Sequence, residues 1–187
     1  MTSSTTTQIP GYVVGTWDID ASHSTVGFSV RHMMVSKVRG YFRDFSGELV
    51  TAADPTRSSV TARINMDSID TRQEQRDAHI RSADFFDVGN HTEMTFRSTA
   101  VKTDGADWTV EGDLTIKGIT RPVALETEFN GVAVDPFGNT RAGLSAETTI
   151  SRKDFGLTWN AVLEAGGVLV SDKVAINLEL AFIAPAA

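Results

Sequence analysis

Period-two alternation of apolar and polar residues is the feature that most constrains this chain. In residues 25–32, Val26, Phe28, Val30 and His32 alternate with small or polar residues. Successive side chains of a β-strand point to opposite faces, so this pattern predicts a strand with one buried and one solvated face. His32 continues the apolar row and places an ionisable ring on the buried side. Similar rows recur up to the C-terminus, which indicates a sheet that is closed or sandwiched around an interior.

Further alternating rows predict strands along most of the chain. They lie at 13–18, 38–50, 58–67, 92–101, 108–117, 123–129, 140–150 and 168–182. The row in 38–50 changes phase near Arg43 and Asp44, which is the mark of a bulge or a sharp bend. A barrel and a sandwich both satisfy the alternation, but curved sheets need such bends in order to close. We therefore expect a mainly β fold, a single antiparallel lipocalin-like barrel of about eight strands.

One segment departs from the strand pattern. Thr71 and Glu74 have the spacing of a capping box, with Thr71 as the N-cap, and residues 73–82 contain no β-branched run. The sequence predicts a short helical insertion there. Arg76 and His79 fall on the same face of that helix.

Composition narrows the class of protein. The 187-residue chain has a formal charge of −7, no cysteine and no Lys- or Arg-rich run, which disfavours nucleic acids and anionic membranes as partners. No apolar stretch approaches the ~18 residues of an integral membrane segment. Residues 1–11 lack the parts of a secretory signal. We therefore expect a flexible tail over 1–11, one domain over 12–185 and a cytoplasmic location.

Motifs of catalysis and metal binding are missing from the sequence. The four histidines do not have the spacing of a metal-binding pair, and there is no Gly-x-Ser-x-Gly elbow, Walker loop or cysteine nucleophile. We expect no metal site, no cofactor and no catalytic residue.

Short motifs follow one another through the chain from Trp17 onward. They lie at 17–20, 23–32, 40–42, 45–47, 68–71, 76–80, 84–87, 112–120 and 151–156. In the order and spacing of these motifs the chain resembles the YceI-like family, polyisoprenoid-binding proteins with a lipocalin-like barrel. The resemblance implies an elongated barrel whose apolar interior holds a long isoprenoid or another amphiphilic lipid, such as a polyprenyl phosphate or a quinone.

Large apolar residues of the predicted strands and loops are candidates for the wall of such a tunnel. Burying a CH₂ group is favourable by about 0.8 kcal/mol, so a long tail could bind without polar contacts. The alternative is that these residues only pack the core. The candidates are Phe28, Val30, Phe42, Phe45, Ile64, Met66, Phe85, Phe86, Met94, Phe96, Leu114, Ile116, Phe155 and Trp159.

Four polar side chains are candidates for holding the polar end of the lipid. His32 could donate a hydrogen bond to a headgroup at the mouth, or could be a core histidine with a protein partner. Arg76 and His79 could bind phosphate or quinone oxygens. Arg76 could instead form an ion pair with a neighbouring aspartate, and Arg152 has the same two interpretations.

The predicted function is binding of the lipid inside the barrel, as a carrier or sequestering protein. Two other classes stay open. An enzyme acting on lipids would use His32 with Asp172, and a stress-response or interaction module would have a filled barrel. A homodimer that pairs sheet edges or apolar surface is compatible with the sequence.

Overall fold

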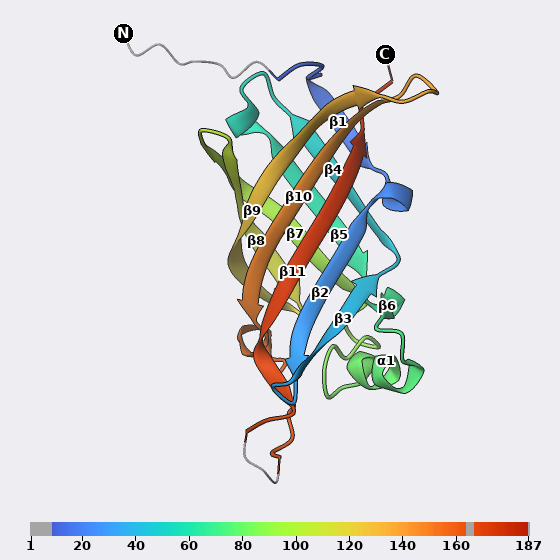
Figure 1. Cartoon of the computed structure of the whole chain (residues 1–187), viewed down its shortest axis with the longest axis vertical. Helices are drawn as coiled ribbons and strands as arrows, with labels where there is room; N and C mark the ends of the chain where they lie inside the picture. The colour runs from blue at the N-terminus through green and yellow to red at the C-terminus, as the bar shows by residue number, and fades with distance from the viewer. Residues whose placement is uncertain (1–8, 164–166, 187) are drawn as a thin grey trace.

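The computed structural model describes residues 9–163 and 167–186. Within these residues an antiparallel sheet of eleven strands wraps into a barrel, and one short α-helix lies near one end (Figure 1). The strands are β1 (Gly15–Ile19), β2 (Thr25–His32), β3 (Ser36–Phe42), β4 (Phe45–Thr51), β5 (Ser59–Asn65), β6 (Ile69–Asp70), β7 (Glu93–Asp104), β8 (Asp107–Ile116), β9 (Ile119–Val134), β10 (Thr140–Ser151) and β11 (Val170–Ile183). The helix is α1 (Glu74–Arg81), and single 3-10 turns lie at Ala21–His23, Pro55–Arg57, Met66–Ser68 and Arg152–Phe155.

The barrel closes through eight strand positions. Neighbours follow in the order β1, β4, β5, β7, β8, β9, β10 and β11, and β11 pairs back with β1 at Asp18–Ile183 and Ile19–Phe182. Farther from its C-terminal end, β11 pairs with β2, which in turn pairs with β3. One position in the barrel is therefore shared by β1 and β2, which act together as one bent strand. The neighbouring position is shared in the same way by β3 and β4. The prediction of a mainly β, single antiparallel barrel with a helical insertion is confirmed.

The bend predicted near Arg43 and Asp44 separates β3 from β4. Because the chain leaves the hydrogen-bonded ladder at this bend, the backbone N–H and carbonyl groups there need other hydrogen-bond partners. The Arg43 N–H donates to the Ser68 carbonyl (3.2 Å), and the Asn65 N–H donates to the Asp44 carbonyl (2.9 Å). The bend is therefore held by the last residue of β5 and by the turn that follows it, and it lets β3 pair with β2 while β4 pairs with β1.

Helix α1 begins later than predicted, and Thr71 as its N-cap is wrong. Gln73 is the N-cap, and its side chain accepts a hydrogen bond from the Arg76 N–H. Thr71 is buried, and its N–H (2.9 Å) and hydroxyl both donate to the Asp77 carboxylate. Arg72, with φ +65°, turns the chain between Thr71 and the helix. The Thr71 hydroxyl is thus engaged by a side chain from inside the helix rather than by the helix terminus.

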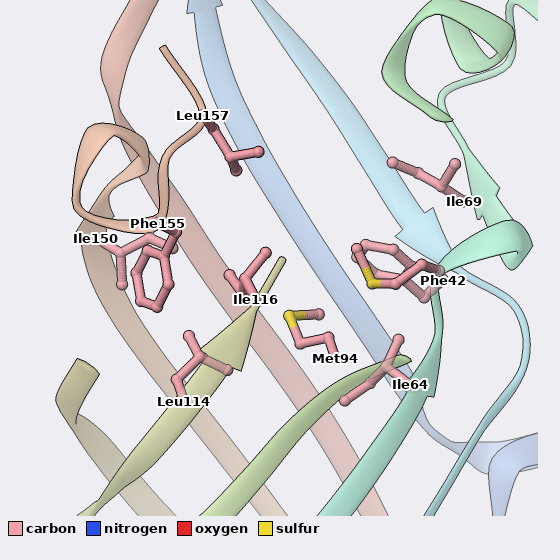
Figure 2. Close-up of a cluster of buried hydrophobic side chains, with 10 residues drawn as sticks. Phe42, Ile64, Ile69, Met94, Leu114, Ile116, Ile150, Phe155 and Leu157 are labelled. Atoms are coloured by element: carbon pink, nitrogen blue, oxygen red, sulfur yellow. The ribbon is translucent and has the colours of Figure 1, made fainter. Parts of the chain in front are cut away.

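The interior differs between the two ends of the barrel. We call the end at which β1 begins and β11 ends the upper end, and the end at which α1 lies the lower end (Figure 1). A cluster of buried side chains from strands and from the segments that follow β5 and β10 fills the lower half, as Figure 2 shows. Its members are Phe42, Ile64, Met66, Ile69, Met94, Leu114, Ile116, Ile150, Phe155 and Leu157. Towards the upper end the buried cluster is small and consists of Trp17, Ala142 and Phe182.

Candidate ligand-binding cavity

An apolar cavity of about 210 Å³ occupies the upper half of the barrel. Its floor is formed by Ile64, Met94 and Leu114, which also belong to the buried cluster below. The side wall comes from inward positions of most strands. These include Trp17, Ile19, Val26, Phe45, Leu49, Val60, Ala62, Phe96, Val101, Trp108, Val110, Val123, Leu125, Phe129, Val132, Ala142, Leu144, Ala146, Ile176, Leu178, Leu180 and Phe182.

Strand alternation places these side chains in the wall. On β9, Val123 and Leu125 are half-buried and line the cavity, whereas Ala124 and Glu126 between them are exposed. The side-chain period of a strand is two, so each strand contributes every second residue. The same residues that make the strand amphipathic therefore make the cavity apolar.

The described residues that line the cavity include no Asp, Glu, Lys, Arg or His. The polar side chains of the wall are mostly hydroxyls, and those near Trp17 are already engaged. Trp17 Nε1 donates to the Val13 carbonyl (3.0 Å) and to Thr51 Oγ1 (3.1 Å), and Thr51 Oγ1 donates to the Val13 carbonyl (2.7 Å). A charged group entering this cavity would lose its hydration without gaining a counter-ion, so the cavity favours neutral, apolar groups.

The segment before β1 lies at the upper end of the cavity. Ile9 and Tyr12 line it, and the Tyr12 N–H donates to the Ile9 carbonyl (3.1 Å). The Tyr12 hydroxyl donates to the Ala52 carbonyl, which fixes its ring beside Ser58. Residues 1–8 of the predicted tail lie outside the described residues.

The predicted wall residues divide between the cavity and the packed lower half. Phe45, Ile64, Met94, Phe96 and Leu114 line the cavity. Phe42, Met66, Ile116 and Phe155 are buried in the lower cluster, and Phe28 and Phe86 pack against it. The Phe42 ring centroid lies 5.8 Å from that of Phe28 and 6.5 Å from that of Phe86. Val30 is half-buried on the lower part of β2, where it pairs with Val38.

Three other candidates meet at the lower end. His79 from α1 lies between Phe85 and Trp159, with ring centroids at 5.2 Å and 4.7 Å, and the centroids of Phe85 and Trp159 are 5.3 Å apart. His79 Nε2 is 2.9 Å from Asp84 Oδ2. These contacts join the helix to the loop after β10, so the three residues form a contact between two segments and do not line the cavity.

Arg76 and His32 also lie away from the cavity. Arg76 donates from Nε to Thr71 Oγ1 (2.8 Å) and from Nη2 to the Thr71 carbonyl (2.7 Å), so it holds the turn before its own helix. His32 is half-buried at the lower end of β2, where its backbone pairs with Ser36 and Val170.

Arg152 organises the backbone of the loop that leads into β11. Its buried guanidinium donates to the carbonyls of Leu157 (2.6 Å), Trp159 (2.8 Å), Ser171 (2.8 Å) and Val170 (3.2 Å). Burial lowers the pKa of this guanidinium, and the Asp172 carboxylate opposes the shift. Its donors point to backbone carbonyls rather than into the cavity.

Asp172, the second member of the enzyme hypothesis, is engaged by other groups. It accepts hydrogen bonds from Ser151 Oγ (2.6 Å) and from the Lys153 N–H (3.2 Å). Burial raises the pKa of this carboxyl, but these hydrogen bonds outweigh it and the pKa lies below its usual value. Within the described residues Asp172 makes no hydrogen bond to His32, so no catalytic pair is assembled there.

Most residues of the upper cavity wall were not among the wall residues predicted from the sequence. Val60, Trp108, Leu125, Phe129 and Leu180 line the cavity, and all five stand in alternating rows that predict inward-facing positions. The alternating pattern of the sequence is enough to predict which side chains point into the barrel. It does not indicate where those inward side chains leave a cavity between them.

Over residues 9–163 and 167–186, no three His, Asp or Glu side chains gather in a way that could hold a metal ion. No helix in the described part of the chain is both long and apolar enough to cross a membrane.

Comparison with known proteins places the fold. A family model described as the YceI-like domain matches residues 17–182. The chain belongs to the YceI-like family. It is 41% identical over 143 residues to a UPF0312 protein of Pectobacterium atrosepticum, and this aligned region covers 76% of this chain and 74% of the relative. It is also 41% identical over 141 residues to the protein YceI of Escherichia coli O17:K52:H18, covering 75% and 74%.

Solved structures share the barrel. The Campylobacter jejuni YceI protein superposes with a TM-score of 0.71 at 28% identity, covering 94% of this chain and 98% of that one. A polyisoprenoid binding domain from Saccharophagus degradans has a TM-score of 0.69 at 17% identity, covering 90% and 98%, and this likeness concerns the fold alone. The relatives whose sequences match carry family names and no enzyme names, which agrees with the prediction that the chain is not an enzyme.

Proposed function

We propose that this YceI-like protein binds an isoprenoid or similar amphiphilic lipid by burying its apolar tail in the upper cavity, as a carrier or sequestering protein. The observation that carries the proposal is the cavity itself, about 210 Å³ of space surrounded by apolar side chains inside a closed barrel. A barrel that served only as an interaction module would have no use for such a space. The polyisoprenoid binding domain from Saccharophagus degradans supports the proposal by its shared fold.

The cavity can hold part of a long tail as it stands. An engineered apolar cavity of about 150 Å³ stays dry and binds benzene, so this larger one has room for an apolar group of at least that size. Met94 lies at its floor, and methionine side chains repack readily around a flexible ligand. A longer tail would push into the lower half by displacing such side chains, or would extend past Ile9 and Tyr12.

Electrostatics favour a lipid with a neutral end group. Arg76, His79 and Arg152 hold structural contacts at the lower end, and the cavity wall carries no charged side chain among its described residues. Burying a phosphate there would cost several kcal/mol of lost hydration without compensation. A quinone or a prenol is therefore the favoured class over a polyprenyl phosphate. The cytoplasmic location stays a prediction.

Native mass spectrometry of the freshly purified protein, followed by denaturing extraction, tests this function. We expect an adduct in one-to-one ratio that extracts as a neutral prenyl lipid, or stoichiometric uptake of an added prenyl quinone by an empty protein. A protein that carries no lipid and takes up neither a quinone nor a polyprenyl phosphate would overturn the proposal. Uptake of the phosphate in preference to the quinone would overturn only the choice of end group.

A matched pair of variants locates the bound tail. Ala62 on β5 is half-buried and lines the cavity, whereas Ala124 on β9 is exposed on the outer surface. Ala62→Leu should fill part of the cavity and weaken quinone binding about tenfold or more, the equivalent of about two CH₂ groups of lost burial. Ala124→Leu makes the same chemical change outside the barrel and should leave binding unchanged. Equal affinities in the two variants would show that the tail does not occupy this cavity.

A further inference from the structure

Five large apolar residues are exposed together at the lower end of the barrel. Met33, Met34 and Val35 form the turn between β2 and β3, and Val162 and Val168 pair with each other in an isolated antiparallel bridge ahead of β11. Val35 is 82% exposed and Val162 is 87% exposed. Both segments lie at the end of the barrel opposite to the start of β1, as Figure 1 shows. We call these five residues the apolar tip.

Hydrogen bonds hold the two parts of the apolar tip together. The Met33 N–H donates to the Leu169 carbonyl (2.9 Å), and the Leu169 N–H donates to the Ala161 carbonyl (2.9 Å). Val162 and Val168 form an antiparallel bridge, and Ser171 Oγ lies 3.8 Å from Met34 Sδ. These contacts place two segments that are far apart in the sequence side by side in the apolar tip.

The backbone of this turn does not favour the residues it carries. Met33 and Met34 have φ of 53° and 62°, a left-handed conformation that asparagine and glycine adopt more readily than methionine. A turn selected only for its shape would carry one of those residues. Two long apolar side chains are instead held in solvent at a conformational cost, which points to a partner that covers them.

Basic side chains surround a groove that borders the apolar tip. Arg31 on β2 lies opposite Lys37 on β3, and both line a groove of about 540 Å³ together with Lys173 and Val168. Within the described residues none of these three cations forms a salt bridge. Among the described residues that line the groove, Asp172 is the one acidic side chain, so three cations face one carboxylate. On a chain of charge −7 this is a local excess of positive charge, and it runs against the expectation from composition that anionic membranes are disfavoured.

We propose that the lower end of the barrel docks on an anionic lipid bilayer, with the apolar tip entering the headgroup region and Arg31, Lys37 and Lys173 binding lipid phosphates. Apolar side chains flanked by basic residues are the surface that anionic membranes bind. A second copy of the chain fits this surface less well. A two-fold contact through the tip would bring the two sets of cations together, at a cost in like-charge repulsion.

Co-sedimentation with vesicles tests the docking surface. The protein should sediment with vesicles that contain phosphatidylglycerol, less with pure phosphatidylcholine vesicles, and less at high salt because ions screen the attraction. Met34→Asn with Val35→Ser should weaken sedimentation. Asparagine suits the left-handed turn, so this variant should fold. Phe137→Ser removes a side chain that is 88% exposed between β9 and β10, at the other end of the barrel, and should change nothing.

Charge variants separate lipid docking from other partners. Lys37→Gln and Lys173→Gln should each lower the affinity for anionic vesicles about fivefold, whereas Lys102→Gln, on the upper part of β7, should not. Ala62→Leu should keep vesicle binding, so failure of the cavity proposal would not affect this one. Absence of binding to anionic vesicles, or binding that ignores lipid charge and these variants, would overturn the proposal. A dimer that Met34→Asn converts to a monomer would assign the tip to a second copy instead.

Discussion

Gly112 on β8 has no room for a side chain, and this absence of space shapes the cavity wall. A Cβ atom there would lie 2.4 Å from Phe96 Cζ and 2.6 Å from the Arg97 carbonyl oxygen. The Phe96 ring therefore packs over the bare backbone of the neighbouring strand and forms part of the cavity wall.

Substitution of Gly112 should cost stability because both the ring and a backbone carbonyl would have to move. We expect Gly112→Ala to lower the free energy of unfolding by about 1–3 kcal/mol, measured by urea denaturation. Gly89→Ala is the matched control, since a Cβ at Gly89 meets nothing within 4 Å. The prediction is wrong if the two variants unfold at the same urea concentration.

The loop between β10 and β11 depends on one buried side chain. Arg152 donates to the loop carbonyls of Leu157 and Trp159 and to two carbonyls at the start of β11, and the loop in turn places Trp159 against His79 of α1. The planar fork of donors thus ties the irregular backbone of the loop to the first residues of β11. Lysine keeps the positive charge but cannot reproduce that fork.

Arg152→Lys should therefore leave carbonyls unsatisfied and loosen the lower end of the barrel. We expect a loss of about 1–3 kcal/mol in the free energy of unfolding, with faster amide exchange in residues 157–163 and 167–171. Hydrogen exchange read by mass spectrometry locates the effect, and Lys153→Gln, at the exposed neighbouring position, is the control. Unchanged protection of the loop in Arg152→Lys would show that the four hydrogen bonds are dispensable.

Much of the barrel could be predicted from the sequence because the facing of a strand residue is a local property. The phase change at Arg43 and Asp44 was enough to place the bend, and the rows of β8 and β9 gave the inward positions. The start of α1 was not predictable in the same way. Thr71 has the spacing of an N-cap, but Asp77 competes for its hydroxyl once the helix has formed.

The candidate site could be predicted only in part, because a cavity depends on the combined side-chain volumes of residues that are far apart in the sequence. Phe155 and Leu157 enter the lower half from the chain after β10 and fill it, whereas inward residues of the upper strands leave a gap. No local pattern tells the two halves apart. The basic groove could not be predicted from the sequence for a similar reason. Arg31, Lys37 and Lys173 come from three different strands, and the sequence contains no basic run.

Closure of the whole barrel depends on a short seam between β1 and β11. Their register contains Asp18–Ile183 and Ile19–Phe182, and an ion network braces the chain beside it. Arg141 on β10 donates to Asp20 (2.5 Å) and to Asp135 (2.6 Å). Hydrogen bonds from Ser22 and Arg141 hold the pKa of Asp20 well below its usual range. Hydrogen bonds from Arg141, Asn139 and Phe137, with Arg141 the largest contributor, lower the pKa of Asp135 to about 2.

These shifts fix how stability should depend on pH. A carboxyl with a lower pKa in the folded protein stabilises it above the unfolded pKa of about 4, and this contribution is lost as the pH falls towards the folded value of about 2. The melting temperature should therefore fall steeply between about pH 4 and pH 2.

Arg141→Gln should lower the melting temperature near neutral pH and should make its fall below pH 4 less steep, because both carboxyls lose the partner that they share. Arg63→Gln removes an exposed pair with Glu93 (3.5 Å) and should leave the profile unchanged, since exposed pairs contribute little. Parallel melting profiles for wild type and Arg141→Gln across this range would show that the seam does not depend on the network.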